Sequence, residues 1–132
     1  MQVNAASTFG QFGAPGNAGY CASKGAVIQL TRTAAKENPH IRINAVSPGK
    51  LKQFCILPFE MRCAQTVTAS GSVNTPLSRG ENPEHVKKGL QVTVQKRRAE
   101  AEEIAKVIAF LLSDEASYMT GSVTNVDGGW VC

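Results

Sequence analysis

The chain has 132 residues, of which 42% are hydrophobic and 18% are charged, values ordinary for a soluble globular protein. Its net charge of +4 is mild, and the densest basic run, at residues 96–98, is followed at once by acidic residues. This disfavours a nucleic-acid-binding patch. No apolar run approaches the ~18 residues of a transmembrane span, and no secretory signal pattern is present, so we expect a cytoplasmic protein without membrane contact.

The cysteines and histidines are not spaced as metal ligands or as a redox pair. None of the four cysteines has CxxC spacing: Cys21, Cys55, Cys63 and Cys132. His40 and His85 have no ligand-spaced partners. We therefore expect reduced thiols and no metal site.

The first predicted element is a strand over residues 2–7, which ends in small side chains. A loop follows, marked by glycine and proline: Gly10, Gly13, Pro15 and Gly16. A helix is predicted over residues 18–38, where Pro39 stops it. Its apolar side chains recur at helical spacing: Ala22, Ala26, Val27, Leu30 and Ala34.

Residues 41–46 alternate apolar and polar side chains and predict a second strand, which Ser47, Pro48 and Gly49 break. A strand, a long helix and another strand form a right-handed crossover unit in a parallel sheet. Ligands bind such sheets at the carboxyl ends of the strands. Ser7 and the Pro48-Gly49 pair are both expected at that edge.

The C-terminal part of the chain predicts two helices and a last strand. The first helix is short, over residues 83–91, and the second, over residues 100–113, has acidic residues in its first turn. The second helix carries an apolar stripe: Ile104, Val107, Ile108 and Leu111. Residues 114–121 form a connection, residues 122–126 a strand, and residues 127–129 a turn.

Ser7, Tyr20 and Lys24 are the candidate catalytic residues. Tyr20 and Lys24 are one helical turn apart and share a helix face. An ammonium group there would stabilise the phenolate and make Tyr20 a general acid/base near neutral pH. The loop after Ser7 can fold back so that its hydroxyl meets a substrate oxygen. On spacing alone, the Tyr20–Lys24 pair could equally be an ordinary helix-surface pair.

The full string of motifs is more specific than this spacing. The chain contains VNAAS, GxxGxPG, YxASK and RINAVSPG, followed by EEIAxxIxFLxS and TGxxxxVDGG. Together they resemble the active-site half of the short-chain dehydrogenase/reductase family. The resemblance implies an α/β fold, the C-terminal part of one Rossmann-like, doubly wound parallel sheet over residues 1–132.

The resemblance implies that Ser7, Tyr20 and Lys24 are three members of the family's catalytic tetrad. Tyr20 would transfer the hydroxyl proton, Ser7 would hold the substrate oxygen, and Lys24 would bind the nicotinamide ribose. Cofactor contacts are implied for six residues: Tyr20, Lys24, Pro48, Gly49, Val73 and Thr75. An NAD or NADP cofactor, a small-molecule alcohol or carbonyl substrate, and a homo-oligomer (dimer or tetramer) sharing the helix at residues 18–38 are also implied.

Residues 50–70 depart from the family pattern as an atypical insert. Removing residues 50–71 joins Pro48-Gly49 to Ser72-Val73-Asn74-Thr75-Pro76, which restores the pattern. One hypothesis is a translated intron, since Gly-Lys and Ser-Gly can be encoded by splice-site-like codons. The alternative is a genuine insertion that forms a lid over the substrate.

The motifs of the family's first half, TGxxxGxG, NNAG and the tetrad asparagine, do not occur in the sequence. We therefore expect a fragment that is unstable alone, binds the nicotinamide cofactor weakly, and has impaired activity. The alternative to an enzyme is a non-catalytic fragment that docks on a full-length relative.

Overall fold

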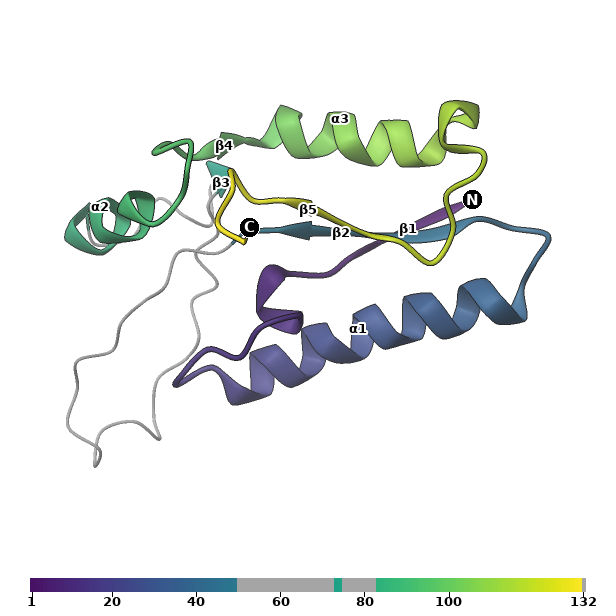
Figure 1. Ribbon diagram of the computed structural model, residues 1–132, viewed down its shortest axis with the longest axis horizontal. Helices are drawn as coiled ribbons and strands as arrows, with labels where there is room; N and C mark the ends of the chain where they lie inside the picture. Colours follow the sequence, from purple (N-terminus) through teal and green to yellow (C-terminus); the bar gives the residue numbers. More distant parts are fainter. Residues whose placement is uncertain (50–72, 75–82, 132) are drawn as a thin grey trace.

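The computed structural model describes residues 1–49, 73–74 and 83–131 (Figure 1). The predicted insert at residues 50–70 and the predicted cofactor residue Thr75 lie outside these described residues. Among the described helices, none has both the length and the apolar character that crossing a membrane requires.

The centre of the fold is a three-stranded parallel sheet in the order β1–β2–β5. Its strands are β1 (Gln2–Ala5), β2 (Ile43–Pro48) and β5 (Val123–Val126). Gln2 lies opposite Ile43 in the first pair, and Ala45 lies opposite Val123 in the second. The parallel sheet predicted from the sequence is therefore confirmed.

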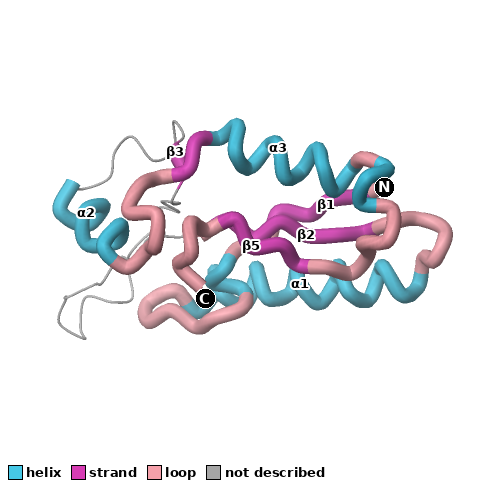
Figure 2. Tube along the Cα trace, turned by 45° about the horizontal axis from the view of Figure 1, so that its top comes forward, coloured by secondary structure: helices cyan, strands magenta, loops and turns pink. Residues whose placement is uncertain are grey.

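One helix covers each face of this sheet, α1 (Ala18–Glu37) on one side and α3 (Ala101–Leu112) on the other (Figures 1 and 2). A parallel sheet covered on both faces buries both sides of its central strand. Residues 43–47 of β2 are accordingly all buried. The core centres on Ala6, Ile28 and Ala45.

The second strand differs from the prediction in its bounds. It begins at Ile43 and continues through Ser47 and Pro48, where the sequence predicted a break. Ser47 and Pro48 pair with β5, and the Gly49 N–H donates to the Val126 carbonyl at 3.3 Å. The sequence predicted a strand over residues 41–46, but pairing with β5 extends β2 through Pro48.

The helix α1 forms as predicted and ends before Pro39, but its buried face differs from the apolar stripe in the sequence. The buried residues are Ile28, Thr31 and Ala35. Leu30 in the stripe is 63% exposed. Thr31 fits the buried face because its hydroxyl donates to the Val27 carbonyl at 2.8 Å and accepts from the Asn4 side chain at 2.9 Å.

The two C-terminal helices are confirmed as α2 (Pro83–Gln91) and α3. A capping box between Glu100 and Glu103 fixes the start of α3. The shorter elements are two 3-10 turns, η1 (Thr8–Gly10) and η4 (Asp114–Ala116), and a small parallel pair, β3 (Val73–Asn74) with β4 (Ala99–Glu100). The sequence did not predict this pair.

Candidate active site

Ser7 lies at the carboxyl edge of the sheet, two residues after β1, which ends at Ala5 rather than at Ser7 as the sequence predicted. The Ala6 N–H donates to the Val46 carbonyl at 2.8 Å, which continues the pairing with β2 up to this point. Ser7 is buried, and its Oγ accepts a hydrogen bond from the Phe9 N–H at 3.3 Å. A serine hydroxyl has one donor and two acceptor positions, so this cap uses only part of its capacity.

Tyr20 and Lys24 lie in the first two turns of α1, on the face that the spacing predicts. The Lys24 Nζ lies over the Tyr20 ring, 5.9 Å from its centroid. The same Nζ donates to the Ala5 carbonyl at the end of β1, at 2.9 Å. Lys24 therefore joins the tyrosine to the strand that leads into Ser7.

Phe9 contacts both Ser7, which follows β1, and Tyr20, which lies on α1. Its backbone binds the Ser7 hydroxyl, and its ring meets the Tyr20 ring edge-on, with centroids 6.3 Å apart and an interplanar angle of 80°. Phe9 is only 2% exposed. The structure thus brings the segments of Ser7, Tyr20 and Lys24 together around one buried aromatic ring.

Gly10 sets how closely η1 approaches α1. A Cβ atom added at Gly10 would lie 2.6 Å from the Lys24 carbonyl carbon and 2.9 Å from the Gly25 nitrogen. Both neighbours are backbone atoms of α1, and real Cβ atoms essentially never come within 3.0 Å of another atom. Glycine is therefore needed for η1 to approach the backbone of α1 this closely.

The predicted cofactor residues Pro48 and Gly49 lie at the same edge, at the end of β2. The Pro48 carbonyl lies 3.5 Å from the Thr8 Oγ1. Gly49 is buried, and a Cβ atom there would lie 2.6 Å from the Cβ of Asp127, the residue that follows β5. This contact alone requires glycine, and the cofactor role of both residues stays a prediction.

Val73, another predicted cofactor residue, lies in β3 and pairs with Ala99 of β4, outside the three-stranded sheet. Its cofactor role also stays a prediction. The turn at residues 127–129 follows β5 directly. It lies close to Gly49, because the Gly49 N–H donates to the carbonyl of Val126, the last residue of β5.

Sequence reasoning missed two residues near the site. The Gln11 Nε2 donates to the Ser47 Oγ at 2.9 Å and to the Asn125 Oδ1 at 2.6 Å, which ties the loop to β2 and β5. The Trp130 ring lies on Phe9, with centroids 5.6 Å apart. Nothing marks Gln11 in the sequence, but Trp130 is the single tryptophan and directly follows a Gly-Gly pair.

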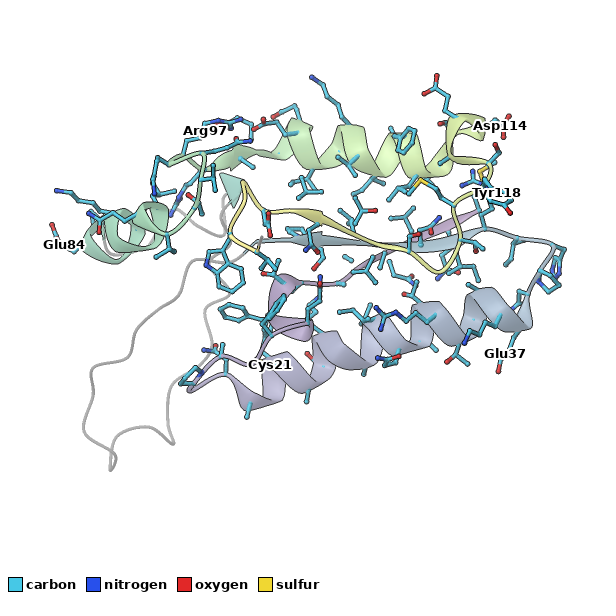
Figure 3. The ribbon with its side chains drawn as sticks, in the orientation of Figure 1. Cys21, Glu37, Glu84, Arg97, Asp114 and Tyr118 are labelled. Atoms are coloured by element: carbon cyan, nitrogen blue, oxygen red, sulfur yellow. The ribbon has the colours of Figure 1, made fainter. Side chains whose placement is uncertain are left out.

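An exposed ion pair lies at the start of α3, where Arg97 is labelled in Figure 3. Arg97 and Glu103 form a salt bridge at 2.7 Å. The hydrogen bond from Arg97, followed by that from the Glu100 backbone, lowers the pKa of Glu103 to about 2. The pair adds to the capping box at the beginning of α3, and as an exposed pair it contributes little to stability.

Comparison with known proteins agrees with this arrangement. Residues 2–55 match the family described as short chain dehydrogenase, and residues 61–131, more than half of the chain, match the family described as Enoyl-(Acyl carrier protein) reductase. The chain belongs to the short-chain dehydrogenase/reductase family. A short-chain dehydrogenase/reductase of Botryotinia fuckeliana, aba4, is 39% identical over 98% of this chain and 45% of its own length.

Solved structures of the family share the fold. A short-chain dehydrogenase/reductase from Brucella melitensis, described as a glucose/ribitol dehydrogenase, superposes with a TM-score of 0.77 at 32% identity over 100% of this chain and 46% of its own. A 4-hydroxyisoleucine dehydrogenase complexed with NADH also gives 0.77, at 29% identity over 98% and 46%. The chain therefore spans about half the length of these relatives, and its elements form part of their Rossmann-like fold.

Proposed function

We propose that this chain carries the acid/base residues of an oxidoreductase that transfers hydride between NAD(P)(H) and an alcohol or carbonyl compound. The observation that carries the proposal is the grouping of Ser7, Tyr20 and Lys24 at the carboxyl edge of β1, around Phe9. Ligands of open parallel sheets bind at this edge.

Tyr20 is the proton donor and acceptor in this proposal. In reduction its phenol gives a proton to the carbonyl oxygen of the substrate, and in oxidation it takes the proton of the hydroxyl group. The Ser7 hydroxyl donates a hydrogen bond to the same oxygen and orients it. A bound nicotinamide supplies or accepts the hydride. The Lys24 ammonium, 5.9 Å from the ring centroid, places a positive charge beside the developing phenolate.

Lys24 also fits the ribose end of a nicotinamide cofactor. An ammonium group has three donors, and the bond to the Ala5 carbonyl uses one of them. The others are available for ribose hydroxyls beside Tyr20. Pro48, Gly49, Val73 and Thr75 would line the nicotinamide and phosphate side. A family relative was solved with NADH, which supports a nicotinamide cofactor and leaves NAD and NADP as the two candidates.

We further propose a cytoplasmic homo-oligomer, dimer or tetramer, that takes small-molecule substrates. The exposed Leu30 on α1 supports an interface on that helix, because a large apolar side chain gains from being covered.

The two tyrosines of the chain provide a test with a built-in control. We would measure NAD(P)H consumption with a panel of ketones for Tyr20→Phe and Tyr118→Phe, since Tyr118 is fully exposed and belongs to no part of the site. General acid/base catalysis contributes about 10²–10⁴-fold, so Tyr20→Phe should lower turnover by at least about 100-fold while Tyr118→Phe retains it. Equal turnover in both variants, or no turnover in the unmodified chain, would favour the non-catalytic docking fragment.

A further inference from the structure

We propose that Trp130 is a positioning residue for Tyr20, and that it acts through the ring of Phe9. The inference rests on the proposed role of Tyr20. Trp130 lies at the opposite end of the chain from Phe9, and the turn that follows β5 holds it against the Phe9 ring.

The Asp127 carboxylate holds this turn in one conformation. Its Oδ1 accepts from the Gly129 N–H at 3.0 Å, and its Oδ2 accepts from the Val131 N–H at 3.1 Å. Gly128 and Gly129 have φ angles of 64° and 76°, in the left-handed region that favours glycine. Trp130 therefore lies between two residues whose backbone is bound to one buried carboxylate.

The turn is also fixed against its neighbours on two sides. On one side Asp127 packs against Gly49, where a Cβ atom would lie only 2.6 Å away. On the other side the Gln95 N–H donates to the Gly128 carbonyl at 3.0 Å, and a Cβ atom at Gly129 would lie 2.8 Å from the Val94 Cβ. These contacts fix the backbone on both sides of Trp130, and we call the turn at residues 127–129 its support.

The Trp130 ring packs on the Phe9 ring with centroids 5.6 Å apart, and the Phe9 ring meets the Tyr20 ring edge-on with centroids 6.3 Å apart. Both separations fall within the range of favourable aromatic pairs. Phe9 is buried, so a ring held on both sides has little freedom to rotate. Removing Trp130 frees one side of Phe9 and lets the Tyr20 ring leave its present orientation.

Fluorotyrosine labelling tests this without cofactor or turnover. The chain has two tyrosines, so ¹⁹F NMR of the labelled protein gives two signals, and Tyr118→Phe assigns them. Tyr118 is fully exposed and lies well away from Cys21, the neighbour of Tyr20 (Figure 3). It therefore serves as a reference. Trp130→Ala should move the Tyr20 signal toward that of Tyr118, because the ring leaves Phe9, while the Tyr118 signal stays in place.

Two further variants keep the test decisive if Trp130→Ala does not fold. Trp130→Phe retains a ring against Phe9, and Trp130→Leu retains bulk without a ring. We expect the Tyr20 signal to stay near its original position in the phenylalanine variant and to move in the leucine variant. A Tyr20 signal unchanged in the leucine variant, or moved equally in both, would overturn the proposal. Because no cofactor is present, a failure of the proposed activity leaves this readout unaffected.

Discussion

Replacing Gly10 with alanine tests how η1 is seated on α1. The added Cβ would lie 2.6 Å and 2.7 Å from the carbonyl carbon and oxygen of Lys24, and 2.9 Å from the Gly25 nitrogen. All three are backbone atoms, so no side chain can move aside. The segment that carries Ser7 must instead shift away from the helix that carries Tyr20 and Lys24.

The size of the effect follows from these distances. Real Cβ atoms essentially never come within 3.0 Å of another atom, so the new Cβ and the Lys24 carbonyl carbon must move apart by at least about 0.4 Å. Ordinary van der Waals contact begins only at 3.4 Å. Overpacking of this kind costs about 1–3 kcal/mol. Each kcal/mol lowers the Tm of a domain of this size by about 2–8 °C.

Gly13 in the same loop provides the matched control, because a Cβ atom there meets nothing within 4 Å and its φ lies outside the left-handed region. Gly13→Ala should be neutral or gain about 0.4–1 kcal/mol by restricting the unfolded chain. We would measure both variants by urea denaturation. Equal free energies of unfolding for the two would refute the close approach of Gly10 to α1.

Two further predictions concern the ends of α3. Arg42→Gln should lower the free energy of unfolding by about 2 kcal/mol in urea denaturation, because the guanidinium donates to the Leu111 carbonyl at 2.9 Å and the Ser113 carbonyl at 2.6 Å; unchanged stability would show that water replaces these bonds. Hydrogen bonding to Arg97 holds the folded-state pKa of Glu103 at about 2, below the ordinary 4.5. The Glu103 carboxylate should therefore make a small contribution to the free energy of unfolding above about pH 4.5. That contribution should disappear as the pH falls through about 2. The difference in urea midpoint between the natural chain and Glu103→Gln should shrink over that interval, and a constant difference would contradict this assignment.

Local signals made much of the fold and of the candidate site predictable. Tyr20 and Lys24 share one helix, so their spacing alone places them on one face, and the structure has them together. The helix at residues 83–91 and the strand before the turn at 127–129 also carry their own signals in adjacent residues. Each depends on neighbours in the sequence rather than on packing.

The features that sequence reasoning missed depend on neighbours distant in the chain. Strand β2 extends to Pro48 because β5 lies alongside it, and periodicity within β2 cannot show this. Thr31 is buried in α1 because Asn4 of β1 supplies a hydrogen bond. The contact of Trp130 with Phe9 joins the two ends of the chain, and no local pattern predicts it.

The central claim is that Ser7 and Tyr20 act on one substrate oxygen as a unit, and a double-mutant cycle tests it most directly. Turnover of NAD(P)H with a reducible ketone would be measured for Ser7→Ala, Tyr20→Phe and the double variant. Residues that act together lose activity non-additively, so the double variant should be about as slow as Tyr20→Phe alone. Losses that multiply, as for two independent groups, would contradict a shared site.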